Sequence, residues 1–161
     1  MKKIRHNLLF LILSTFLVSC GFKIVNQSEL INFKINEIVS SGESSINFKL
    51  KSKISYTLKN LDDFSVKNIN LDLNTQKIKN IKEKNIKNQI TKYNLSIIVK
   101  IELTELKTNK KISFLVNRTG DYDVANQHSE TLNNEKKLIE ILTDNLSDDI
   151  LDELIKRTND L

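Results

Sequence analysis

Three kinds of side chain in this sequence could carry chemistry: a single cysteine, a histidine in the second half of the chain, and a group of cations. Cys20 is the only cysteine, so an internal disulfide is excluded. His128 has no cysteine or histidine companion nearby, which argues against a zinc site. Six lysines lie between residues 77 and 92, and Arg118 offers a guanidinium that can hold a phosphate with two hydrogen bonds. These residue types favour anionic ligands over metal ions.

Cys20 closes a leader segment. Three basic residues within the first five precede an apolar run from Leu8 to Val18, which is broken by two hydroxyl residues. A basic start and a short apolar core are typical of a secretory signal peptide, and the run is too short to span a bilayer. Leu17-Val18-Ser19-Cys20 matches a bacterial lipobox, where signal peptidase leaves the cysteine as an acylated first residue. We therefore predict a lipoprotein signal peptide over 1–19 and a lipid anchor at Cys20. The alternative is an ordinary signal peptide with a cysteine there by chance.

The charge of the mature chain is nearly balanced. Removing 19 residues from 161 leaves 142, which is enough for one domain with a core. The leader holds three of the 25 basic residues and none of the 20 acidic ones, so the mature part has a net charge of +2 rather than +5. The composition therefore gives no case for nucleic-acid binding.

The mature chain begins with an irregular segment that leads into a strand. Residues 20–30 lack hydrophobic periodicity, and we interpret them as a lipidated tether before a single domain over 31–158. Four odd positions are apolar among polar neighbours: Ile31, Phe33, Ile35 and Val39. This alternation predicts a strand with one buried face, which ends at a turn over residues 40–42.

The segment from Ser44 to Lys59 fits two periods. Its alternation of apolar and polar residues, which includes Phe48 and Tyr56, is typical of a strand. A second pattern runs at four-residue steps through Ile46, Leu50, Ile54 and Leu58. Such a stripe is typical of a helix, and the length and the lysines of the segment favour this alternative, with Ser44 or Ser45 as N-cap.

The next region contains a second strand and a tract rich in lysine. The strand runs from Phe64 to about Leu73, and a change of parity near Lys67-Asn68 suggests a bulge. The Lys/Asn/Ile tract from Lys77 to Lys92 is either part of a long hairpin that turns near Lys84-Asn85 or a mobile loop.

A third and a fourth strand form a clearer hairpin. Odd positions from Leu95 to Leu103 are apolar, and the chain then turns at residues 107–109, because asparagine tolerates a left-handed conformation. The return strand is apolar at even positions from Ile112 to Val124. Arg118 shares that parity, so the strand has either run past the edge of the core there or is bent by Gly120.

A long helix begins at Ser129. Its main apolar stripe comprises Leu132, Ile139, Leu142, Leu146, Ile150 and Leu154, widened by Leu138, Ile141, Leu151 and Ile155. A stripe this wide is typical of a helix laid on a sheet. The order β-α-β-β-β-α therefore predicts an α+β two-layer sandwich, in which a four-stranded, mostly antiparallel sheet carries both helices on one face. We expect one shared core of Ile97, Val99, Ile101, Phe114, Val116, Leu142 and Leu146.

The sequence lacks the patterns that mark common enzymes. There is no glycine-rich phosphate loop, no nucleophile elbow and no Ser/His/Asp set. Asp148-Asp149 and Asp152-Glu153 are typical of a solvated helix face rather than of an acid/base pair. We therefore predict that the protein is not an enzyme and uses no metal or cofactor.

The order and spacing of these features resemble the lipopolysaccharide-assembly lipoproteins of the LptE type over almost the whole mature chain. The matching features are the lipobox with Cys20-Gly21-Phe22, the strand that soon follows, the central hairpin from Tyr93 to Tyr122, and the helix from Asn134 to Leu154. The sequence departs after Phe22, where many relatives carry a proline and a tyrosine but this chain has Lys23-Ile24-Val25.

The resemblance implies a location and a partner. Such proteins are anchored by N-terminal acyl chains to the outer membrane on its periplasmic side. They sit in the lumen of the LptD β-barrel, plug it, help it assemble and contact lipopolysaccharide on its way to the cell surface. The resemblance also implies that Ser44–Lys59 is a helix. The alternatives are a periplasmic scaffold or pilot lipoprotein of another envelope complex, and an unrecognised hydrolase.

The candidate contacts to lipopolysaccharide are cations, because its inner core and lipid A carry phosphates and carboxylates. The candidates are Lys82, Lys84, Lys87 and Arg118. The alternative is a solvated lysine-rich tip that reflects a biased composition.

Overall fold

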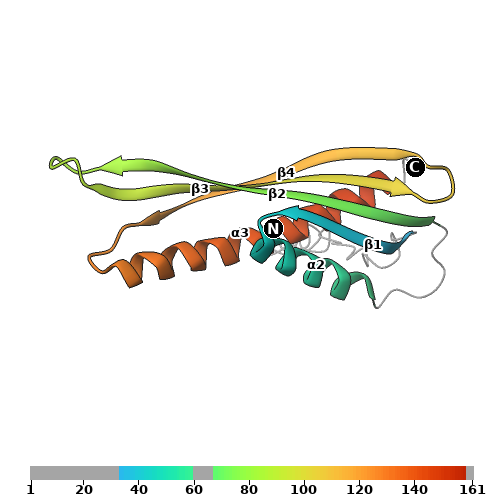
Figure 1. Cartoon of the computed structure of the whole chain (residues 1–161), viewed down its shortest axis with the longest axis horizontal. Helices are drawn as coiled ribbons and strands as arrows, with labels where there is room; N and C mark the ends of the chain where they lie inside the picture. Colours follow the sequence, from blue (N-terminus) through green and yellow to red (C-terminus); the bar gives the residue numbers. More distant parts are fainter. Residues whose placement is uncertain (1–32, 60–66, 159–161) are drawn as a thin grey trace, which may run out of the picture.

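The computed structural model of the chain describes residues 33–59 and 67–158, which form an open four-stranded sheet with two helices on one face (Figure 1). The elements are β1 (Phe33–Gly42), α2 (Ser44–Lys59), β2 (Lys67–Lys84), β3 (Ile90–Glu105), β4 (Lys111–Asp123) and α3 (His128–Thr158). The strands lie in the order β1-β2-β3-β4, and β1 runs parallel to β2 while the other neighbours are antiparallel. The predicted α+β sandwich is confirmed. The predicted signal peptide, the tether and Cys20 lie outside the described residues.

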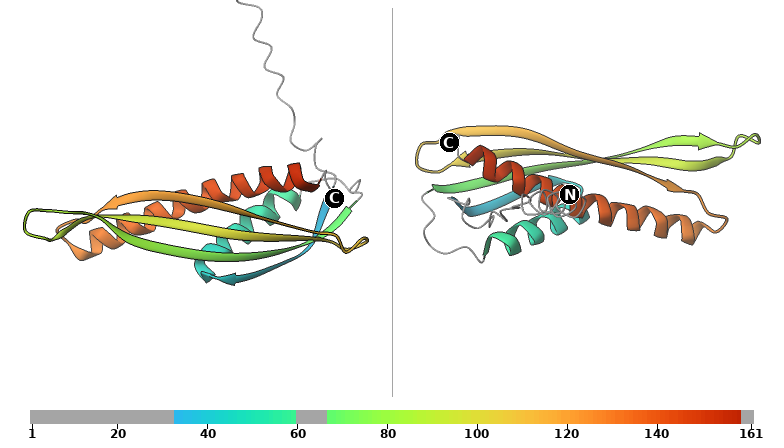
Figure 2. Two further views of the ribbon diagram at one scale, coloured as in Figure 1. Left: turned by 90° about the horizontal axis from the view of Figure 1, so that it is seen from above. Right: turned by 180° about the vertical axis from the view of Figure 1, so that it is seen from behind.

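The sheet is long, and the helices cover different parts of it. β2 has 18 residues, and a strand of that length spans about 60 Å at roughly 3.3 Å per residue. The turn between β2 and β3 projects beyond the start of α3, whereas α2 lies against the other half of the sheet (Figure 1 and Figure 2). We call the end with the β2–β3 turn (residues 85–89) distal and the end with the β3–β4 turn (residues 106–110) proximal.

An aliphatic core fills the space between the helices and the sheet. Ile97, Val99 and Ile101 of β3 are fully buried, as is Leu146 of α3. Burial of apolar surface is the main favourable term in folding, so this cluster anchors both helices. The predicted core is confirmed, with Ile97, Val99, Ile101, Phe114, Leu142 and Leu146 buried and Val116 packed against them while partly exposed.

α2 is a helix, as the four-residue period favoured. Ile46, Leu50 and Ile54 are at most 2% exposed and belong to the core. Phe48 and Tyr56, which a strand would have placed on the same face as these residues, are 73% and 74% exposed. The buried residues of this segment therefore follow the four-residue helical period and not the two-residue period of a strand.

The buried face of β1 changes parity within the strand. Phe33 is buried and Ile35 is partly buried, as the odd positions predicted. A register shift between Ile35 and Glu37 then turns Ile38 toward the core and leaves Val39 exposed. A bulge adds one residue to a strand, so every side chain beyond it changes face. The prediction that Val39 belongs to the buried face is wrong for this reason.

The lysine-rich tract is part of a strand and not a mobile loop. β2 extends to Lys84, pairs with β3 almost to its end, and turns at Asn85 as the hairpin alternative predicted. The pairing of β2 with β1 shows no register shift at Lys67-Asn68, where a bulge was predicted. The prediction rested in part on Phe64 and Val66, which lie outside the described residues.

The amino-terminal half of α3 is less buried than the predicted stripe required. Leu132 and Ile141 were assigned to that stripe, yet they are 51% and 57% exposed. The distal half of the sheet presents polar and aromatic side chains to this part of α3, so there is less apolar surface for the helix to cover. Neither helix in the described part of the chain is both long and apolar enough to cross a membrane.

Candidate functional site

The distal hairpin ends in a turn that is built around one asparagine. The Asn85 carboxamide oxygen accepts hydrogen bonds from the backbone N–H groups of Lys87 and Gln89, at 2.9 and 3.0 Å. Asn88 has φ 61°, a left-handed conformation that asparagine tolerates. Ile86 lies in this turn and is fully exposed. The turn therefore exposes an aliphatic residue that is followed in the sequence by Lys87.

Ion pairs engage half of the six lysines in this region. Lys79 pairs with Glu135, Lys82 with Asp121, and Lys92 with both Glu83 and Asp123. Hydrogen bonds from Asn94 and then from Lys82 lower the pKa of the Asp121 carboxyl group. Lys84 and Lys87 form no ion pair with any residue of the described ranges. Their ammonium groups are therefore available to an external anion without first breaking a contact.

A polar and aromatic cluster joins the distal half of the sheet to α3. Lys79 Nζ donates to Glu135 Oε2 at 2.7 Å and lies 4.2 Å from the centroid of the Tyr93 ring. The Tyr122 hydroxyl donates to the same carboxylate oxygen at 2.7 Å, and its ring stacks on Tyr93 with centroids 5.5 Å apart. Burial opposes ionisation of Glu135, but the hydrogen bonds from Lys79 and Tyr122 outweigh it and lower the pKa of this carboxyl group.

This cluster was not predicted from the sequence, although the sequence contains a signal for it. The side of the sheet that faces the helices includes Lys79, Tyr93 and Tyr122. Their strand partners are buried or face the helices as well. A lysine at that parity needs an acidic partner on the covering helix. Glu135 of α3 is that partner, so Lys79 joins α3 to the sheet and does not belong to the distal turn.

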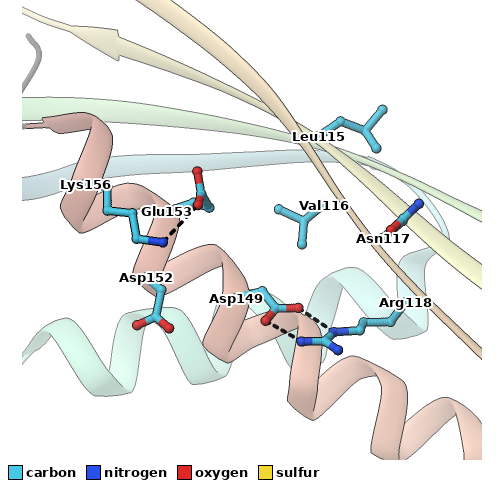
Figure 3. A pocket seen from close by; sticks show the side chains of 8 residues that line it. All are labelled: Leu115, Val116, Asn117, Arg118, Asp149, Asp152, Glu153 and Lys156. Carbon is cyan, nitrogen blue, oxygen red and sulfur yellow. Dashed lines mark hydrogen bonds and ion pairs between the residues drawn. The ribbon is translucent and has the colours of Figure 1, made fainter.

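Arg118 is held by α3. Its Nε and Nη2 donate to the two carboxylate oxygens of Asp149 at 2.5 and 2.6 Å (Figure 3). These hydrogen bonds raise the pKa of the guanidinium still further above neutrality. Lys82 pairs with Asp121, which has the opposite parity to Arg118 on β4, so Arg118 and Lys82 project from opposite faces of the sheet. The candidate cations therefore do not form one cluster.

Gly120 does not interrupt the pairing of β4 with β3, which continues through it without a register shift. A Cβ atom at this position would lie 2.7 Å from Leu138 Cδ1, so the glycine allows α3 to approach the sheet closely. Arg118 thus faces α3 and forms an ion pair with Asp149 there. The strand has not run past the helix at this position.

The groove beside Arg118 is lined by two cations and three carboxylates, and two of these carboxylates form ion pairs within it. It has a volume of about 380 Å³ and is lined by Leu115, Val116, Asn117, Arg118, Asp149, Asp152, Glu153 and Lys156 (Figure 3). Arg118 pairs with Asp149, and Glu153 pairs with Lys156 at 3.2 Å. In the part of the chain that the structure describes, no three His, Cys, Asp or Glu side chains are grouped to hold a metal ion. Acidic side chains of α3 form ion pairs with β4 through Asp149, with α2 through Glu140 and Asp148, and within the helix through Glu153.

Comparisons with known proteins find similarity in structure only. Neither a family model nor a curated protein matches the sequence. The rare lipoprotein B from Shewanella oneidensis superposes with a TM-score of 0.59 at 11% identity, over 78% of this chain and 98% of that chain. The uncharacterized lipoprotein B from Nitrosomonas europaea gives 0.55 at 15% identity, over 86% and 90% of the two chains. The minor lipoprotein from Acinetobacter baumannii gives 0.52 at 16% identity, over 79% and 92%.

These similarities establish the fold. The matched regions cover nearly the whole length of each solved chain, so the shared unit is the complete β-α-β-β-β-α arrangement rather than a common hairpin. The identities of 11–16% are too low to transfer a site or a partner. This chain therefore has the same fold as several bacterial lipoproteins.

Proposed function

We propose that this chain is a lipid-anchored protein of the bacterial cell envelope that sits in an LptD-type β-barrel of the outer membrane. There it helps the barrel to assemble and assists the delivery of lipopolysaccharide to the cell surface. Cys20 is the acylated anchor in this proposal. Phe22 rather than an aspartate follows Gly21, which by analogy with lipoprotein sorting favours the outer membrane. The protein acts as a scaffold and contributes no catalytic step.

The observation that supports the proposal most strongly is the fold, which is shared with three proteins that are named lipoproteins. The lipobox at Leu17–Cys20 is an independent feature, because it is a sequence pattern that lies outside the residues described by the structure. If Cys20 were a chance cysteine in an ordinary signal peptide, there would be no reason for a fold shared with lipoproteins to follow it. Anchoring is firm only when two or more acyl chains contribute, at roughly 0.8 kcal/mol per buried methylene group.

The distal hairpin is the part that we assign to lipopolysaccharide. Lys84 and Lys87 are without ion-pair partners among the described residues, and the exposed Ile86 lies between them. Two ammonium groups beside an aliphatic side chain suit an anionic amphiphile. Lys82 and Arg118, which were also candidates, would each have to exchange a carboxylate for a phosphate. We therefore place the main contacts at Lys84 and Lys87.

A pull-down of the mature protein in mild detergent, followed by mass spectrometry of its partners, tests the proposal. We expect a large outer-membrane β-barrel protein as the main partner and an acylated N-terminal cysteine. Cys20→Ser should leave uncleaved precursor or soluble periplasmic protein, and normal processing with membrane retention would rule out the anchor. Recovery of a different envelope complex in place of the barrel would favour the pilot or scaffold alternative.

A further inference from the structure

The outer side of α2 carries an exposed surface that the proposed function does not use. Phe48 and Tyr56 are 73% and 74% exposed, and they lie on the side of the helix opposite its buried stripe. Ser52 and Ser55 are exposed on the same side. Exposed aromatic side chains at helical spacing are unusual on a domain whose other aromatic residues include the buried Phe33 and Phe114.

The charge of α2 is entirely positive. Its 16 residues include four lysines and no acidic side chain. Lys49 and Lys53 extend to acidic residues of α3, where Lys49 pairs with Glu140 at 3.2 Å and Lys53 with Asp148 at 3.0 Å. Lys51 instead lines, with Phe48, a hollow of about 590 Å³ between α2 and the end of β1. The outer side of α2 therefore combines aromatic rings, hydroxyl groups and an ammonium group.

We propose that the α2 outer face, comprising Phe48, Lys51, Ser52, Ser55 and Tyr56, rests on the surface of the bilayer that holds the acylated Cys20. This inference rests on the acylation in the proposed function. Aromatic rings concentrate at membrane interfaces, and basic helices are attracted to anionic headgroups. A protein partner fits this surface less well, because lysine is depleted in the cores of protein–protein interfaces.

The length of the tether supports a bilayer as the occupant. Twelve residues, 21–32, separate Cys20 from Phe33, where β1 begins. A chain of that length spans at most about 45 Å when it is fully extended, so an acylated domain stays within reach of the membrane surface. α2 follows β1 after one residue and lies away from the β2–β3 turn (Figure 1). Contact through α2 therefore leaves the distal hairpin free to enter a barrel.

A tryptophan reporter tests this contact. The chain has no tryptophan, so Phe48→Trp introduces a single fluorophore on the α2 outer face. The acylated protein is reconstituted into vesicles of phosphatidylethanolamine and phosphatidylglycerol that contain brominated lipid. We expect a blue shift and strong quenching for this variant. Leu115→Trp, at an exposed position of β4, is the matched control and should remain unquenched. Equal quenching of the two variants, or none in either, would overturn the proposal.

Two further measurements separate this inference from the proposed function. Lys51→Glu in the Phe48→Trp background should weaken quenching in anionic vesicles and leave it unchanged in vesicles of phosphatidylcholine. The double variant Phe48→Ser with Tyr56→Ser should still recover the β-barrel in the pull-down. Loss of the barrel from that variant, or protection of the reporter from lipid when the barrel is bound, would show that α2 faces the barrel wall. Mass spectrometry that finds Cys20 without acyl chains would refute the premise and the inference together.

Discussion

The two halves of α3 are attached to the sheet by different chemistry. In the carboxy-terminal half, Leu146, Ile150 and Leu154 are fully buried in the aliphatic core. In the amino-terminal half, Glu135 is held by Lys79 and Tyr122, while two apolar side chains of the helix, Leu132 and Ile141, stay exposed. A segment with few buried apolar contacts opens at a lower free-energy cost than one in the core. We therefore expect the proximal half to provide most of the stability of the domain, with the distal half as a weakly attached extension.

The largest effect should follow from a charge placed in the proximal core. Val99 is fully buried and pairs with Thr75 and Val116 on the neighbouring strands. Val99→Asp should abolish the cooperative thermal transition seen by circular dichroism, because an unpaired buried carboxylate adds several kcal/mol to the roughly 2–5 kcal/mol lost with buried apolar groups. Lys100→Asp, on the exposed face of the same strand, should be tolerated. Similar stability of the two variants would contradict the assigned strand faces.

Replacing either of two glycines by alanine should have an intermediate effect on the free energy of unfolding, and it tests the difference between the two halves. Gly42 has φ +90°, and a Cβ atom there would lie 1.9 Å from the backbone oxygen of Thr75. Gly42→Ala should therefore cost about 2–3 kcal/mol in urea unfolding, because backbone must move. Gly120→Ala meets only the end of the Leu138 side chain, which can change rotamer, so we expect about 1 kcal/mol or less. A larger cost at Gly120 would show that the distal half is as rigidly packed as the proximal half.

Glu135→Gln tests the distal attachment directly. We expect a loss of about 1 kcal/mol, with faster amide hydrogen exchange in the first half of α3 and unchanged exchange around Leu146. The pKa of Glu135 is lowered in the fold, so its contribution is present above the unfolded pKa of about 4.3 and is lost as the pH falls through the folded pKa. The difference in Tm between wild type and variant should accordingly vanish in acid. Exchange that increases equally along the whole helix would mean that α3 is one cooperative unit.

The smallest effect on stability should come from the lysines of the two turns. Lys84→Glu with Lys87→Glu changes the distal turn, and Lys107→Glu with Lys110→Glu makes the same charge change in the proximal turn. Each pair should alter the free energy of unfolding by less than about 0.5 kcal/mol, because the residues are exposed. At low ionic strength, only the distal pair should weaken binding to purified lipopolysaccharide. Equal binding by the two variants would leave the distal lysines as a solvated tip.

Helices and strands were predictable from the sequence wherever one hydrophobic period dominated a segment. The odd positions of β3 from Leu95 to Leu103 are all fully buried, because alternation is a property of the strand itself. The turn at Lys107–Asn109 was also predictable, and Asn109 has the expected positive φ of 55°. Element order and the amphipathic stripes were then enough to predict the two-layer fold, since apolar faces must be covered. The anchor at Cys20 stays a prediction.

The tertiary structure decided which side chains meet. A bulge in β1, which depends on pairing with β2, moved Val39 out of the core. Leu132 is exposed although it continues the apolar stripe of α3, and Arg118 pairs with Asp149 because α3 crosses β4 there. A periodic pattern reports the direction of a side chain relative to its own backbone. Such a pattern carries no information about the helix or strand that packs against that side chain. The ion-pair partners of Lys79 and Arg118 come from α3, which begins only at residue 128.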